Sequence, residues 1–342
     1  MHLHEWTFGA LLIVCILAIA CSKNDDGADG GSNGDTDGDT DGDTDGDGDS
    51  DTDADGDTDS DADGDSDTDS DTDADATPEV CDGIDNDNNG IIDDVDVGGD
   101  GICDCLNIGT IGRIGPWSTG GNIFADWLIS KSSIPPVEIG DQVLTPELLA
   151  GLDVIVVLRA DTAELGQDSS PAHHEFSEDE VAALEEWVNG NGGLMTTIGY
   201  QGDESQEVLN VNRLLSPFGL GYQTQNEYLQ LTGFLTEFAT HPITEGIEEI
   251  FTDNGVEPNP ENGTPIAWGD NDAVAMVVGE PGEGKVIVFG DEWITYDSEW
   301  TDIDTDGNEV ENPQIVLFWL NMIKWLTPAE ICQVEIPEIV AE

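Results

Sequence analysis

The chain has 342 residues, with 76 aspartates and glutamates against seven lysines and arginines, and its formal net charge is −69 at pH 7. Such a charge excludes nucleic acid and anionic lipid surfaces as partners, because both would repel the protein. Apolar residues gather in a short N-terminal run and again after residue 105. We therefore expect an anchor, a charged tether and a folded head.

The N-terminal apolar run, residues 8–20, suits the core of a signal peptide and is shorter than the ~20 residues that span a bilayer. We expect residues 1–20 to be removed. The run Leu17-Ala18-Ile19-Ala20-Cys21 resembles the lipobox of bacterial lipoproteins. This resemblance implies lipidation of Cys21 and a protein held in the bacterial cell envelope, at the outer membrane or cell surface, through its lipid. Residues 1–7 contain no lysine or arginine, so a plain secretory signal or an uncleaved anchor is the alternative.

Residues 21–77 form the predicted tether. From Asp35 to Asp75 every odd-numbered residue is aspartate, with only Gly, Thr, Ser and Ala between them. This low-complexity composition has nothing to bury and repels itself, which predicts a disordered spacer. A calcium array is the alternative, but a calcium loop needs a carboxylate at its even twelfth position, and strict alternation places none there.

Residues 78–105 contain a calcium-type loop. The spacing fits the calcium-loop template, with Gly90 at the sharp turn of position 6 and an aspartate where a bidentate glutamate is usual at position 12. An Asp/Asn-rich turn is the alternative. Because all the donors are oxygens, we expect calcium. The predicted ligands are Asp85, Asp87, Asn89, the Ile91 carbonyl, Asp93 and Asp96.

The run from Glu79 to Gly90 resembles the MopE-type metal-binding motif of secreted bacterial proteins, which implies metal binding. Asn88 stands where that motif has its second cysteine. The substitution leaves Cys81 available for Cys103 or Cys105.

Export would place four cysteines, Cys81, Cys103, Cys105 and Cys332, in an oxidising compartment, where they allow two disulfides in three pairings. Cys105 precedes the first predicted strand and Cys332 follows the last helix. We expect a Cys105–Cys332 bridge that ties the two ends of the head together. A soft-metal site at Cys103 and Cys105 would need a second cysteine or histidine pair at zinc-site spacing, and the chain has none.

The head, residues 106–328, alternates between strand and helix patterns, and residues 329–342 form a tail. A capping box at Ser177 and Glu180 begins one of the helices. Such alternation predicts an α/β fold with a parallel sheet covered by helices on both faces. We expect strands at 106–111, 153–158, 194–198, 273–278 and 285–289, and helices at 122–130, 179–189, 208–215 and 315–326.

Four segments of the head, residues 152–158, 185–193, 241–246 and 284–291, resemble the class I glutamine amidotransferase-like fold, closest to its trehalose-utilisation-type branch. The resemblance implies a flavodoxin-like sheet. The family's chemistry does not carry over, because residues 196–201 contain no cysteine and Asp291-Glu292-Trp293 replaces the late His-X-Glu. We therefore expect a ligand-binding head without catalysis and without an organic cofactor.

Ligands of open α/β sheets bind beyond the carboxyl ends of the strands. Two of the three arginines lie there, which favours a carbohydrate or another small polar ligand. The alternative function is a carbohydrate-active hydrolase or isomerase with Asp161, Asp291 and Glu292 as acid and base. The predicted ligand-binding residues are Arg113, Arg159, Asp161, Tyr200, Gln201, Asp291 and Trp293.

Successive side chains of an extended segment point in opposite directions, so only one of Asp291 and Glu292 can enter this site. We expect it to be Asp291, facing Arg159 and Tyr200. Trp293, Tyr296 and Trp300 suit either a sugar platform or a lid packed on the core.

Two further groups carry predictions. His173 and His174 lie in a polar stretch before the capping box, where we expect them to be exposed. Asp302, Asp304 and Asp306 match the first positions of a second calcium loop. Pro313 occupies its twelfth position, so Glu309 or Glu311 would have to complete that site.

Overall fold

The computed structural model describes residues 78–90, 92–112, 120–162, 172–199, 206–224, 230–303 and 307–328. The predictions for the signal peptide, Cys21, the tether and Cys332 lie outside these ranges, as do those for Arg113, Tyr200 and Gln201. Within these ranges no helix is long and apolar enough to cross a membrane.

An eight-stranded sheet forms the centre of the head, in the order β2-β1-β3-β4-β10-β9-β8-β6. The five strands from β2 to β10 run parallel, and β9, β8 and β6 are antiparallel to their neighbours. The strands are β1 (Ile108–Ile111), β2 (Val137–Gly140), β3 (Val154–Val157), β4 (Gly193–Thr196), β6 (Glu237–Phe238), β8 (Thr264–Trp268), β9 (Val274–Gly279) and β10 (Lys285–Phe289).

The expected α/β sheet is confirmed, but it is not parallel throughout. Only residues 280–284 join β9 to β10, which pair antiparallel. A connection this short can form a hairpin, whereas parallel neighbours need a crossover of a dozen residues or more. The sequence analysis also missed β2, β6 and β8.

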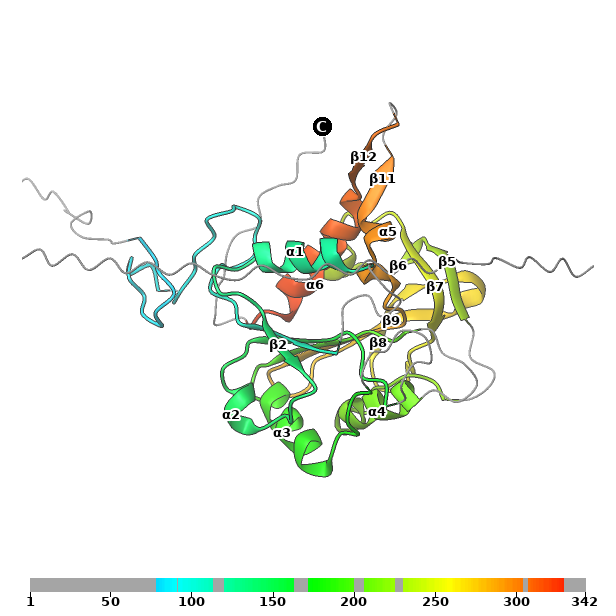
Figure 1. Ribbon diagram of the computed structural model, residues 1–342, viewed down its shortest axis with the longest axis horizontal. Coiled ribbons are helices and arrows are strands. Elements are labelled where there is room, and N and C mark those ends of the chain that lie inside the picture. Colours follow the sequence, from blue (N-terminus) through cyan, green and yellow to red (C-terminus); the bar gives the residue numbers. More distant parts are fainter. Residues whose placement is uncertain are drawn as a thin grey trace, which may run out of the picture. The chain divides into compact units, whose positions relative to one another are not determined.

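Helices cover both faces of the sheet (Figure 1). α1 (Asn122–Ser130) and α6 (Pro313–Leu326) share one core cluster, and α2 (Pro146–Leu149), α3 (Glu178–Asn189) and α4 (Gln206–Leu215) share the other. Strand β3 contributes side chains to both clusters, because its successive side chains point to opposite faces of the sheet. Val154 and Val156 pack in the first cluster, and Ile155 and Val157 in the second.

Local signals set the helix boundaries. The predicted capping box is present: the Ser177 side chain accepts the Glu180 N–H, and the Glu180 side chain accepts the Ser177 N–H. At α6, Asn312 caps the Gln314 N–H and Pro313 occupies the first turn, where its missing N–H is harmless. α1 has the predicted bounds.

Smaller elements complete the head. β5 (Gln230–Leu235) pairs with β7 (Ile250–Val256), and β11 (Thr301–Ile303) pairs with β12 (Glu309–Glu311). α5 (Asp297–Trp300) precedes β11. Short 3-10 turns are η1 (Ser216–Phe218), η2 (Pro242–Thr244), η3 (Asp270–Asp272) and η4 (Trp293–Thr295).

Candidate functional site

The carboxyl ends of β3, β4 and β10 bring together side chains that are distant in the sequence. Arg159 follows β3 and Glu292 follows β10, and Arg159 Nη1 lies 3.8 Å from Glu292 Oε1. The chain after β4 reaches the same place, because the Glu292 N–H donates to the Ile198 carbonyl at 2.9 Å. We define the strand-end cluster as Arg159, Asp161, Glu207, Glu292 and Tyr296.

Arg159 lies between two carboxyl groups. It is 7% exposed, and its Nη2 lies 3.4 Å from Asp161 Oδ2. The Asp161 side chain is 14% exposed and is therefore the more accessible member of this ion pair. Arg159 is thus ion-paired with a neighbouring aspartate, while its contact with a ligand stays a prediction.

Glu292 is one of two buried acids of the cluster, at 2% exposure. The Tyr296 hydroxyl donates to Glu292 Oε1 at 3.2 Å, and Oε2 has no hydrogen-bond partner among the described residues. Burial raises the pKa of Glu292 well above its usual value, the charge of Glu207 raises it further, and Arg159 opposes both. Glu292 therefore favours its neutral form.

Glu207, in the first turn of α4, is a member that the sequence analysis missed. It is fully buried, and its carboxylate accepts the N–H groups of Ala160 at 3.4 Å and Gly199 at 3.3 Å. A Cβ at Gly199 would lie 2.7 Å from Glu292 Oε1, so the chain after β4 needs glycine there. The sequence feature that could have identified Glu207 is its position directly before the apolar Val208, at the start of a predicted helix.

Of the two adjacent acids, Glu292 is the one that contacts Arg159, and the ligand role of Asp291 stays a prediction. Asp291 accepts the Asp253 N–H at 2.6 Å and the Trp293 N–H at 3.0 Å, so its carboxylate holds backbone together rather than facing Arg159. Burial raises the pKa of Asp291 as well. The alternation rule does not apply here, because Glu292 has a helical backbone and begins the η4 turn. The Asp253 N–H that Asp291 binds comes from β7, a strand that was not predicted.

The aromatic residues of this region are packed. Trp293 stacks on Tyr296 with ring centroids 4.6 Å apart, and its indole N–H donates to Glu299 at 2.7 Å. Trp300 is 1% exposed and belongs to the core. Of the two alternatives, packing on the core describes Trp300, and Trp293 is half-buried beside the cluster.

Residues 78–105, which we call the acidic loop, bring part of the predicted calcium set together. Asp85 and Asp87 have carboxylate oxygens within 4.8 Å of one another and of a Glu79 oxygen. The Asn89 N–H donates to both aspartates, at 3.1 and 2.9 Å. Glu79 was not predicted, because it precedes the loop template.

The other predicted calcium ligands make different contacts. Asp93 accepts the N–H groups of Asp82 and Gly83 at 3.0 Å, and Asp96 accepts those of Asp100 at 3.1 Å and Gly101 at 2.9 Å. The Asn89 amide donates to Asp87 and Asp94. Ile91 lies outside the described residues. The calcium roles of these four residues stay predictions.

The proposed second calcium loop lies in the β11–β12 hairpin. Asp302 is paired with Val310, so their side chains share one face and those of Glu309 and Glu311 point to the other. This register does not support either glutamate as the closing ligand. Asp304 and Asp306 lie outside the described residues.

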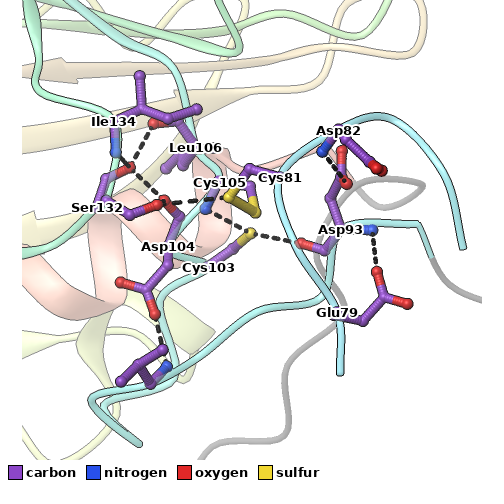
Figure 2. Close-up of a disulfide and its surroundings, with 12 residues drawn as sticks. Glu79, Cys81, Asp82, Asp93, Cys103, Asp104, Cys105, Leu106, Ser132 and Ile134 are labelled. Carbon is purple, nitrogen blue, oxygen red and sulfur yellow. Dashed lines mark hydrogen bonds between the residues drawn. A yellow bond between two sulfur atoms is a disulfide. The ribbon is translucent and has the colours of Figure 1, made fainter. Parts of the chain in front are cut away.

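A disulfide joins Cys81 to Cys105, which corrects the expected Cys105–Cys332 bridge (Figure 2). Asp104, directly before Cys105, attaches the acidic loop to the head, because its backbone carbonyl accepts hydrogen bonds from the Ser132 and Ser133 hydroxyls. Lys131 adds an ion pair with Asp100 at 2.6 Å. Cys103 is also disulfide-bonded.

The two adjacent histidines were wrongly expected to be exposed. His173 is 8% exposed, and its ring packs 4.8 Å from that of Phe176. His174 bonds to Asp141 and Glu180. The sequence feature that could have indicated their burial is an adjacent histidine pair three residues before the capping box.

Comparisons with known proteins gave no matching family model and no matching curated protein. Among solved structures, the chain is similar to cytoplasmic protein STM3548 of Salmonella typhimurium, at 15% identity over 65% of this chain and 100% of that one, with a TM-score of 0.46. A ThuA-like protein of Bacteroides uniformis matches at 11% identity over 65% and 90%, with a TM-score of 0.39. A Thermotoga maritima glutamine amidotransferase matches at 11% over 54% and 74%, with a TM-score of 0.34.

Proposed function

We propose that this protein is a lipid-anchored envelope protein whose head binds a small polar ligand at the strand-end cluster without catalysis. One observation carries the ligand proposal: the buried Glu292 carboxyl has an oxygen without a hydrogen-bond partner among the described residues, next to the Arg159 guanidinium. An unpaired buried polar atom is costly, and a ligand hydroxyl or amine would satisfy it.

The strand order supports this location. Numbered by their order in the chain, the five parallel strands lie as 2-1-3-4-5, the order of flavodoxin-like folds, in which ligands bind beyond the carboxyl ends. Arg159, Ile198 and Glu292 all follow such ends. The amidotransferase-like assignment rests on the same order and on the four segments that resemble that family.

Ligand binding is tested with sugars, polyols and sugar acids against the full chain, by thermal shift and calorimetry. At least one class should raise Tm. Arg159→Lys should weaken its binding about tenfold or more, because an ammonium group cannot reproduce two-nitrogen guanidinium contacts. Glu178→Gln, on the exposed start of α3, is the matched control. Binding unaffected by both Arg159→Lys and Glu292→Gln would refute this site.

The enzyme alternative is favoured by one property of Glu292: burial raises its pKa, as a general acid requires. Asp161, on the open side of Arg159, would be the base. The same sugars, incubated with the protein and followed by NMR, should stay unchanged if the head only binds. Turnover that Glu292→Gln abolishes would establish the enzyme instead.

The acidic loop is proposed to bind calcium, supported by the group of Glu79, Asp85 and Asp87. Calcium at 100 times its Kd should stabilise the head by about 2.7 kcal/mol. Asp85→Asn should remove this gain, and Glu178→Gln, at an exposed position outside both predicted calcium loops, should keep it. A melting curve that calcium and chelator both leave unmoved would show that the loop is only a turn.

The lipid anchor is proposed from the lipobox resemblance alone. Mass spectrometry of the mature protein should find an acylated Cys21 as its first residue. An intact N-terminus, or cleavage elsewhere without acylation, would disprove the anchor.

A further inference from the structure

The adjacent histidines before α3 have a hydrogen-bond acceptor opposite every ring nitrogen. His174 Nδ1 lies 2.6 Å from Asp141 Oδ1, and its Nε2 lies 2.7 Å from Glu180 Oε1. His173 Nδ1 lies 2.8 Å from the His174 carbonyl, and its Nε2 lies 3.1 Å from the Gly140 carbonyl. Four acceptors therefore face two imidazole rings.

Two neutral imidazoles cannot satisfy this arrangement. Each neutral ring carries one N–H and one lone pair, so two of the four contacts would set a lone pair against an oxygen. In each neutral ring, one nitrogen therefore faces an oxygen without an N–H to donate. A cation bound at that nitrogen would use its lone pair.

The surroundings favour the cation. The Nε2 atoms face acceptors that hold a ring in place, a carboxylate for His174 and a backbone carbonyl for His173. Metal-bound histidines typically have this support, which fixes the tautomer and leaves the other nitrogen free to bind. Here the Nδ1 atoms of His173 and His174 lie 3.8 and 2.6 Å from Asp141 Oδ1. One ligand atom from each of the three residues lies within 4.8 Å of the other two.

We propose that Asp141, His173 and His174 bind one divalent transition-metal ion of the zinc class, through Asp141 Oδ1 and the two Nδ1 atoms. Two imidazoles and one carboxylate suit zinc or copper, whereas calcium prefers oxygen ligands alone. Asp141 is 59% exposed along its side chain, so its open side leaves room for water as a fourth ligand. This site is separate from the acidic loop, whose clustered donors are carboxylates.

The ion would join two connections of the head. Asp141 lies between β2 and α2, and the histidines lie between β3 and α3. The His173 N–H also donates to the Asp161 carbonyl at 2.7 Å. Metal binding would thus fix the backbone beside the strand-end cluster without entering it, so the proposal does not depend on the ligand proposed for that cluster.

Calorimetric titration of the metal-free full chain with zinc, in excess calcium to occupy the exposed carboxylates, tests the proposal. We expect one tight site that calcium does not displace. Asp141→Asn should weaken it at least tenfold, and His174→Gln should weaken it at least as much. His241→Gln, a histidine distant in sequence from the cluster, is the matched control and should bind zinc like the parent.

Copper gives a second measurement, which is made first on the parent protein and therefore does not depend on whether a variant folds. One equivalent of Cu²⁺ bound to the parent protein should show two nitrogen ligands in its electron paramagnetic resonance spectrum, and Asp141→Asn should alter that spectrum. A parent spectrum without nitrogen ligands, or zinc affinity unchanged in both Asp141→Asn and His174→Gln, would overturn the site.

Discussion

The acidic loop and the strand-end cluster use carboxyl groups in opposite surroundings. In the loop, Asp85 and Asp87 are half-buried and accept N–H groups a few residues along the chain. In the cluster, Glu292 and Glu207 are nearly or fully buried and meet groups from other strands. Water and nearby N–H groups let the loop gather carboxylates side by side, whereas the dry cluster keeps Glu292 neutral. The same residue type therefore suits cation binding in one region and ligand contact in the other.

Gly112→Ala should have the largest effect, since it places a Cβ 1.7 Å from the Arg159 carbonyl oxygen at a backbone φ of +80°. Neither backbone can move without separating β1 from β3, and the left-handed φ adds strain. We expect a loss on the order of 4 kcal/mol in unfolding free energy, measured by urea denaturation. A loss below about 1 kcal/mol would show that the strand ends are loosely packed.

Removing the Cys81–Cys105 bridge tests how firmly the acidic loop is part of the head. The bridge closes a separation of 24 residues, and replacing both cysteines with serine should lower the unfolding free energy by about 3 kcal/mol, because the unfolded chain regains freedom. Urea denaturation of the head measures it, with Ser298→Ala as an exposed control. An unchanged midpoint would mean that the loop unfolds separately from the sheet.

Glu292→Gln should change how stability depends on pH. As pH rises above about 4.5, Glu292 in the unfolded chain loses its proton while the buried, folded carboxyl keeps it, so the folded state of the parent is progressively destabilised. The slope is about 1.4 kcal/mol per pH unit until the folded group also titrates. Glutamine does not titrate, so this pH dependence disappears in the variant. Its free energy of unfolding should match that of the parent near pH 4 and exceed it at pH 6. Parallel stability curves would show that Glu292 is ionised in the fold.

Gly90→Ala is the counterpart of Gly112→Ala in the acidic loop, and we expect the smallest effect. Its φ of +96° is left-handed, but a Cβ there meets nothing within 4 Å. Strain alone costs about 1–2 kcal/mol, and part of it is offset by the lower entropy of the unfolded chain. Thermal melting with and without calcium measures it. An effect as large as that of Gly112→Ala would place the loop under the same packing constraint as the sheet.

The sequence by itself determined features that depend on short spacings. The capping box of α3 and the bounds of α1 came from local patterns, and so did the meeting of Asp85 with Asp87, because these groups interact within one or two turns of chain. The buried strands β3 and β10 were equally visible, since runs of apolar and mostly β-branched residues have few alternatives to the interior of a sheet.

Tertiary structure alone decided which distant groups meet. The Cys81–Cys105 pairing and the placing of Glu207 beside Glu292 depend on strand order and on loops closing over long separations. Asp291 and Glu292 show the reason most directly. The sequence could not decide which of them contacts Arg159, because Asp291 is held by the Asp253 N–H of β7, 38 residues away in the chain. Local patterns carry no information about which strand supplies such a partner, because a buried carboxyl group binds whichever donor the packed fold brings to it.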